Sequence, residues 1–317
     1  MKRIAINEWA KPAELIPRLR GREFEDCEIL DISRNLLGPE GMRGLINLRF
    51  PKLAALELFA NRIGDRGARF LGAAHFAGQL TRLGLGGESR FGMDNDIGDE
   101  GFVALLPNLT SIADLDLGYN RAGSAAASAL GRCTALKHLR MSANRLGNEG
   151  ARALALAGTK WRLDSLDVSD NQITVEGIAE LARAEWLQSL QRVVLTRNRF
   201  GDEGAKCLAA SNMRPRSLEL NECAMGDAGA AALAASPVLS CVETLGLGDN
   251  RIGEEGLAAL INSPFLGNVR TLYFRNNPAG PSYSPWQDWD GSETGYDFDH
   301  AHADRIAAMF GRTIDVR

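Results

Sequence analysis

The sequence predicts an α/β repeat array, built from short parallel strands that alternate with helices. Three observations predict this class. An alternating LxLxxN pattern recurs along the chain, and an Ala- and Leu-rich stretch follows most copies of it. Between the two lies a seven-residue motif that is almost unchanged in five places: NRIGDRG (61–67), NDIGDEG (95–101), NRLGNEG (144–150), NRFGDEG (198–204) and NRIGEEG (250–256). Recurrence at a fixed period is the signature of stacked repeats.

The residue that closes the LxLxxN pattern occurs ten times, at spacings of 24 to 27 residues except for 34 between Asn61 and Asn95. An asparagine amide donates and accepts hydrogen bonds at once, so we expect these side chains to satisfy backbone groups where neighbouring strands end. Cys223 is a substitute with a weak donor. This structural ladder consists of Asn35, Asn61, Asn95, Asn120, Asn144, Asn171, Asn198, Cys223, Asn250 and Asn277.

The two apolar residues of each pattern, from Leu30/Ile32 to Leu272/Phe274, are two positions apart. Alternation at period two predicts a short strand with one buried face. Ile4/Ile6 and Ile314/Val316 continue the same phase outward. We therefore expect about twelve strands, of which the two terminal ones cover the open ends of the array.

A helix is expected after each ladder residue. The side chains of Asp65, Asp99, Ser124, Asn148, Thr174, Asp202 and Asp227 can accept from free helix N–H groups, which predicts that they are N-caps. Stretches such as EGARALALAG then have apolar residues three and four apart, as an amphipathic helix requires. A glycine recurs in the first helical turn, where it costs about 1 kcal/mol relative to Ala. We infer that backbones approach closely there.

These motifs resemble those of leucine-rich repeat proteins, and the full helix after Asn-x-apolar-Gly-Asp-x-Gly resembles the ribonuclease-inhibitor-like subclass. The resemblance implies a horseshoe-shaped solenoid with a parallel β-sheet on the concave face and α-helices on the convex face. It covers nearly the whole chain, so residues 1–317 are expected to form one domain. This domain comprises an N-terminal cap repeat (1–29), ten repeats (30–280) and a C-terminal cap (281–317) with an aromatic-acidic insertion, a helix and a final strand.

Composition and charge exclude several classes of function. A net charge of −4 and an isoelectric point near 5.7 give no basic footprint for nucleic acid. No run of 18 apolar residues occurs, so no membrane span is expected. Five dispersed cysteines indicate a reducing compartment, and we expect a cytoplasmic monomer. Export by a route without a conventional signal is kept as an alternative.

The sequence contains no recognisable catalytic motif. The four histidines (His75, His138, His300 and His302) have no nucleophile motif beside them, and the Gly-rich segment 84–92 lacks GK[ST]. We expect no enzyme activity, cofactor or metal. Asp288, Asp290, Ser292 and Asp299 stand at positions one, three, five and twelve of a calcium loop, but Glu293 stands where glycine is required. Calcium therefore remains an open alternative.

Two insertions interrupt the period. The segment ESRFGMD (88–94) is either a tolerated loop insertion or a binding loop. The aromatic-rich segment 281–299 either covers the end of the core or forms a recognition surface, since Trp and Tyr are frequent interface anchors.

The middle residue of each LxL pattern is expected on the concave face, where five acids would make this column mostly negative. An arginine directly after the ladder residue recurs five times and would bind acidic groups of a partner, unless it is only solvated or is neutralised by acids such as Glu222 and Asp249. The candidate partner-binding residues are Glu57, Phe59, Asp116, Tyr119, Arg140, Asp167, Thr196, Glu219, Tyr273 and Arg275 on the concave face, and Arg62, Arg121, Arg145, Arg199 and Arg251 along the turns.

These observations favour a non-enzymatic protein–protein interaction module whose concave face and flanking turns bind a protein partner. Long curved surfaces suit extended macromolecular ligands. Two alternatives are kept. The resemblance extends to the repeat domain of Ran GTPase activators, which would make the chain a regulatory protein. A bacterial leucine-rich repeat effector is the other alternative.

Overall fold

The computed structural model describes residues 2–21, 24–88, 94–281, 283–287, 293–311 and 313–317, with the backbone alone for 283–287 and 293–298. The chain divides into two compact units, Met1–Asn171 and Gln172–Arg317.

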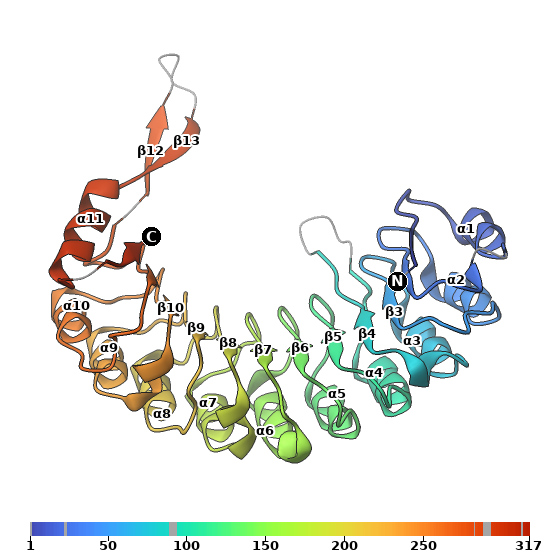
Figure 1. Ribbon diagram of the computed structural model, residues 1–317, viewed down its shortest axis with the longest axis horizontal. Helices are drawn as coiled ribbons and strands as arrows, with labels where there is room; N and C mark the ends of the chain where they lie inside the picture. Colours follow the sequence, from blue (N-terminus) through green and yellow to red (C-terminus); the bar gives the residue numbers. More distant parts are fainter. Residues whose placement is uncertain (1, 22–23, 89–93, 282, 288–292, 312) are drawn as a thin grey trace. The chain divides into compact units, whose positions relative to one another are not determined.

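In the first unit, seven strands pair in chain order, each parallel to the next. The helices lie on one side of these strands and leave the other side open (Figure 1). The strands are β1 (Arg3–Ala5), β2 (Ile29–Asp31), β3 (Ala55–Glu57), β4 (Arg82–Gly84), β5 (Asp114–Asp116), β6 (His138–Arg140) and β7 (Ser165–Asp167). The α-helices are α1 (Pro12–Arg18), α2 (Gly38–Leu45), α3 (Gly64–Gly72), α4 (Asp99–Leu105), α5 (Ser124–Ala129) and α6 (Gly147–Ala157). Short 3-10 helices are η2 (Ala77–Gln79), η4 (Leu106–Asn108), η5 (Leu130–Arg132) and η6 (Gly158–Lys160).

The second unit repeats this arrangement with five parallel strands, paired in the order β8, β9, β10, β11 and β14. The strands are β8 (Arg192–Val194), β9 (Ser217–Glu219), β10 (Thr244–Gly246), β11 (Thr271–Tyr273) and β14 (Asp315–Val316). The helices are α7 (Val175–Ala182), α8 (Gly201–Ala209), α9 (Asp227–Ala234), α10 (Glu254–Ile261) and α11 (His300–Met309), with η7 (Glu185–Ser189) and η8 (Pro237–Cys241). Seven and five parallel strands, alternating with helices in the described residues, confirm the predicted α/β leucine-rich repeat solenoid.

The core forms because the central leucines stand in register. Leu30 pairs with Leu56, and Leu56 with Leu83, and all three are buried. The apolar residue two positions further on, such as Ile32 or Leu58, is buried as well. The residue between them lies on the face that the helices leave uncovered, here called the open face.

The ladder asparagines connect consecutive repeats. Asn144 is typical: its Nδ2 donates to the carbonyl oxygen of Leu117 in the preceding repeat (2.9 Å) and to that of Met141 in its own (3.1 Å). Its Oδ1 accepts from the backbone nitrogen of Ala122 (2.8 Å). At the exceptional position, the Sγ of Cys223 donates to the carbonyl oxygens of Leu195 and Asn221. Burial raises the pKa of this thiol to about 12, so it remains protonated and keeps its donor.

The prediction that seven residues are N-caps was wrong in most positions. Asp65 and Asp202 lie inside their helices, and no side chain caps the N-terminus of α3, α4, α5, α7, α8 or α9 within its own repeat. Thr174 alone holds the N-cap position, and its hydroxyl donates to the carboxylate of Glu176 instead of accepting from a backbone nitrogen of its helix. The aspartates instead cap the helix of the following repeat: Asp65 Oδ1 accepts from the backbone nitrogens of Gly98 (2.6 Å) and Gly101 (3.1 Å).

Asp99, Asp202 and Asp227 cap the next helix in the same way, and the capped glycine then has an extended backbone, as Gly98 does at φ −101°. Where the preceding repeat carries Ser124 instead, the equivalent glycine, Gly147, is left-handed at φ +54°. Its N–H then donates forward to the carbonyl oxygen of Asn171 (3.0 Å). The residue four positions after a ladder residue thus determines the turn of the next repeat.

The close approach inferred from the second glycine is confirmed where such an aspartate is present. A Cβ on Gly101 would lie 2.8 Å from the Cα of Asp65, and one on Gly256 would lie 3.0 Å from the Cα of Asp227. Glycine is therefore needed for one repeat to stack on the carboxylate of its predecessor.

Near the C-terminus, β12 (Tyr283–Gln287) and β13 (Glu293–Phe298) form an antiparallel hairpin, which the sequence interpretation did not anticipate. The expected helix follows as α11 and ends before Gly311, which is left-handed at φ +63°. In the part of the chain that the structure describes, none of the helices has the length and apolar character needed to cross a membrane.

Candidate functional site

The open face of the first unit carries acidic residues at the third position of its strands, and each lies within ion-pair distance of an arginine, with Arg140 shared by Asp116 and Asp167. Arg3 pairs with Asp31 (3.1 Å) and Arg82 with Glu57 (2.8 Å). In the second unit, Arg192 pairs with Glu219 (2.8 Å). These arginines begin their strands, two positions before the acidic column, and therefore face the same side. The prediction of a mostly negative column considered the acids alone and left out these cations, although the five acids still outnumber the four arginines that pair with them in the described residues.

Arg140 forms the centre of a charged cluster on this face. Its guanidinium lies 3.6 Å from a carboxylate oxygen of Asp116 and 3.5 Å from one of Asp167, and its Nε donates to the hydroxyl of Ser142 (3.0 Å). Asp167 also accepts from the backbone nitrogen and hydroxyl of Ser169. The Arg140 side chain is still 50% exposed, so the cluster remains accessible to a partner.

The carboxyl groups of the open face differ in the direction of their pKa shifts. Burial raises the pKa of Glu57, although Arg82 opposes the shift, and burial likewise raises the pKa of Asp116 against the hydrogen bond from Gly118. At Asp31 burial acts in the same direction, but hydrogen bonds from Ser33 and Arg3 outweigh it and lower the pKa. The open face therefore holds charges that are partly desolvated.

The aromatic candidates Phe59 and Tyr273 lie close to arginine side chains. Phe59 lies beneath the guanidinium of Arg34, 5.6 Å from its ring centre, and the Tyr273 ring lies beneath that of Arg317 at 5.9 Å. Arg275 reaches a carboxylate oxygen of Asp249 (3.4 Å). Tyr119 is half-buried in the left-handed residue before Asn120, and the buried hydroxyl of Thr196 lacks a hydrogen bond among the described residues.

The five arginines that follow ladder residues are exposed. Arg121 is tied to Asp96 through its Nε (2.7 Å). Within the described residues, the other four have no ion-pair partner: Arg62 and Arg145 in the first unit, and Arg199 and Arg251 in the second. We call these four the arginine edge.

The expected neutralisation of this edge by Glu222 and Asp249 does not occur. Glu222 pairs with Arg197 (2.9 Å), and Asp249 pairs with Arg275 and accepts from the side chain of Asn276. Both acids are thus engaged by other residues of their own unit. Among the residues that the structure describes, no acid occupies the donors of the arginine edge.

Several candidates lie outside the described residues. Of the 88–94 loop, only Glu88 and Asp94 are described, and Glu88 lies 3.7 Å from Arg34. Asp288, Asp290 and Ser292 of the calcium alternative are not described, whereas Asp299 caps α11 by accepting from the backbone nitrogen of His302 (2.9 Å). A search of the described positions finds no group of three or more His, Cys, Asp or Glu side chains arranged to hold a metal.

Sequence reasoning missed Trp9, a tryptophan that is 49% exposed and has a left-handed backbone at φ +58°. Its backbone nitrogen donates to the carbonyl oxygen of Arg34 (3.2 Å), which places it at the turns of the first two repeats. A bulky residue in this conformation is an outlier. No local motif marked it, because the first repeat lacks the LxLxxN pattern.

Comparison with known proteins identifies the repeats. A family model described as "Leucine Rich repeat" matches five segments: residues 132–155, 163–182, 187–209, 216–234 and 238–260. These matches identify leucine-rich repeats between residues 132 and 260, and the strand-helix geometry is that of a leucine-rich repeat solenoid.

Several solved structures are similar to this chain. An internalin (InlF) from Listeria monocytogenes is 19% identical, with a TM-score of 0.51 over 83% of this chain and 71% of that one. The leucine-rich repeat ectodomain of the Arabidopsis receptor kinase HAESA, in complex with an IDA peptide hormone, is 20% identical with a TM-score of 0.48 over 76% of this chain and 36% of that one. The yeast Rad7 and Elc1 complex is 18% identical with a TM-score of 0.46 over 79% and 70%. At this identity the likeness to the internalin concerns the fold alone.

Proposed function

We propose that this protein is a non-enzymatic interaction module that binds a protein partner through the arginine edge and the adjoining open faces. The observation that carries the proposal is the arginine edge itself: four exposed guanidinium groups recur at one position of the repeat without an acidic partner in the described residues. Arginine presents paired donors that match carboxylates, and it is enriched among residues that dominate binding energy. The partner surface is therefore expected to be acidic.

The open faces would contribute specificity more than net charge. The ion pairs around Arg140, Glu57 and Glu219 offset part of the acidic charge, so a partner has to match a pattern of both signs instead of a single sign of charge. The half-buried rings of Phe59 and Tyr273 supply apolar contact beside these charges.

The proposed location, oligomeric state and repeat subclass rest mainly on the sequence. All five cysteines are free thiols, which supports a cytoplasmic location. A monomer and the ribonuclease-inhibitor-like subclass are part of the proposal. The GTPase-activator and bacterial-effector alternatives rest on resemblance alone, and a GTPase turnover assay without stimulation would exclude the first.

The test is capture of partners from the native lysate with two charge-reversed variants, Arg62→Glu/Arg145→Glu and Arg199→Glu/Arg251→Glu. Arg152→Glu/Arg132→Glu is the matched control, because it reverses the charge of two exposed arginines of α6 and η5 on the helical side. We expect mass spectrometry to identify a protein that is retained by the wild type and the control but lost from at least one edge variant. Identical captures by all four proteins would refute the proposal.

A further inference from the structure

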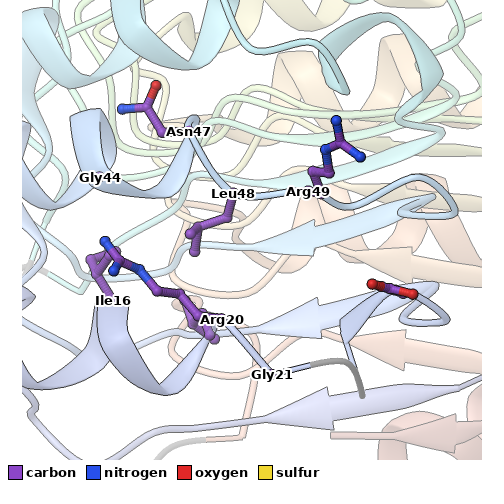
Figure 2. Close-up of a pocket in the computed structure, with 9 residues that line it drawn as sticks. Ile16, Arg20, Gly21, Gly44, Asn47, Leu48 and Arg49 are labelled. Atoms are coloured by element: carbon purple, nitrogen blue, oxygen red, sulfur yellow. The ribbon is translucent and has the colours of Figure 1, made fainter.

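A hollow of about 400 Å³ lies at the N-terminal cap, between the end of α1 and the segment that leaves α2. Figure 2 shows Ile16 and Arg20 on the α1 side and Asn47, Leu48 and Arg49 on the α2 side, with the Leu48 side chain pointing toward Arg20. This volume falls within the range of small-ligand sites, which is about 300 to 1,000 Å³. The hollow belongs to the helical side of the first unit and not to the arginine edge.

The floor of the hollow is aliphatic and preformed. Leu19 is 2% exposed and Leu48 is 9% exposed, and Ile16 is half-buried beside them. A Cβ on Gly44 would lie 3.1 Å from the Ile16 side chain, so the absence of a side chain at residue 44 keeps this wall close and smooth. An aliphatic group of a few carbons can therefore be buried here.

The rim is positively charged. Arg20 and Arg49 are exposed, and within the described residues neither guanidinium has an ion-pair partner. Among the described residues that line the hollow, Glu25 is the one acid, so these residues carry a net charge of +1 (two arginines less one glutamate). The nearby cations Arg18 and Lys52 are already paired, with Glu8 and Asp26.

A second hollow of about 400 Å³ shares Glu25 and Arg49 with the first and adds Pro51 and His75. Arg49 thus stands between two recesses, where a bound anion would be held beside an apolar surface on either side. A guanidinium matches a carboxylate through two parallel hydrogen bonds.

From this combination we propose that the hollow binds a carboxylate that bears a short aliphatic group, with the aliphatic group on Leu19 and Leu48 and the carboxylate on Arg20 and Arg49. This chemistry is shared by a free small acid and by the C-terminal leucine of a peptide. Inorganic phosphate is the wrong ligand, because it has no apolar part to cover the floor.

The experiment follows the methyl NMR signals of Leu19 and Leu48 in the full-length protein during titration with N-acetyl-leucine. We expect saturable shifts in the millimolar range and binding at least about tenfold weaker for N-acetyl-leucinamide, which lacks the carboxylate. Arg20→Gln and Arg49→Gln should each weaken binding, whereas Arg43→Gln on α2 should not. An acetylated peptide that ends in leucine distinguishes the two sources: tighter binding than N-acetyl-leucine indicates a protein C-terminus, and equal binding a free acid.

Three results would overturn the proposal. They are equal binding of acid and amide, methyl shifts produced equally by inorganic phosphate, and the absence of shifts with every probe. The arginines are exposed, so their variants are expected to keep the wild-type thermal midpoint, and loss of binding then reports on the site. Failure of partner capture at the arginine edge leaves this outcome unaffected, because the two sites share no residue.

Discussion

The Oδ1 atom of Asp202 lies 3.0 Å from the backbone nitrogen of Gly229, so a carboxylate in α8 caps α9 of the following repeat. It also accepts from the backbone nitrogen of Gly226 at 2.6 Å. A single side chain therefore satisfies two of the free N–H groups at a helix start and joins two repeats in the same contact. Stability in this region is a property of neighbouring repeats together.

Asp202→Ala should destabilise the protein by about 1 to 2 kcal/mol, the usual loss on removing a helix cap. Amide exchange should increase at Gly226 and Gly229, in the next repeat, and not in α8. Denaturant unfolding and hydrogen exchange measure the two effects. Ser124→Ala is the matched control, since the glycine of its next repeat is left-handed and donates elsewhere. Faster exchange confined to α8 would contradict the cap between repeats.

Gly229→Ala should destabilise by about 1 to 3 kcal/mol, although alanine is the better helix former. The new Cβ would lie 2.5 Å from Cγ of Met225 and 2.7 Å from Oδ1 of Asp202. The double variant with Asp202→Ala should lose less than the sum of the two single losses, because it removes one of the clashing atoms. Gly78→Ala, whose Cβ would come no closer than 3.4 Å to another atom, should be near neutral. Strict additivity in the double-mutant cycle would contradict this contact.

Asn144→Ala should cost about 1 to 3 kcal/mol, because it leaves buried backbone groups without partners. Asn61→Ala should cost less, since the Oδ1 of Asn61 has no hydrogen bond to lose in the described structure. Urea midpoints of the two variants provide the comparison. An unchanged midpoint for Asn144→Ala would mean that the ladder contributes nothing to stability.

The raised pKa of Asp116 predicts a pH dependence of stability. A carboxyl group whose pKa rises on folding binds more protons in the folded state, so its contribution to the free energy of unfolding falls as pH rises. The fall begins near the ordinary value of 3.8 and is complete above the raised folded value. Asp116→Asn should remove this pH-dependent fall. The stability of the variant relative to the wild type should therefore be higher at neutral pH than at pH 3.8. Parallel urea stability curves against pH for the two proteins would contradict the burial of this charge.

The repeat period was predictable because strand alternation and ladder spacing are properties of a one-dimensional chain. Local rules failed where the partner belongs to another repeat. Asp65 was interpreted as the cap of its own helix, but its carboxylate accepts hydrogen bonds from the backbone nitrogens of Gly98 and Gly101 in the next repeat. The negative charge of the acidic column was overestimated because Arg82 and Arg192, on adjacent strands, pair with its acids.

The hairpin of β12 and β13 was missed although the sequence contains a signal for it: Asp290-Gly291 stands between two aromatic-rich stretches. The hollow at the N-terminal cap left no sequence motif. Leu19 and Arg20 come from one segment and Leu48 and Arg49 from another, and only packing brings the two segments together.

The central claim, that the arginine edge contacts a protein partner, is tested most directly by site-specific photocrosslinking in the native lysate. A photoreactive amino acid replaces Arg145 in one variant and Leu156 in another; Leu156 is 67% exposed on α6 and serves as the helical-side control. We predict a discrete crosslinked protein at residue 145 that is absent at residue 156. A crosslink at residue 156 alone, or at neither position, would contradict the account.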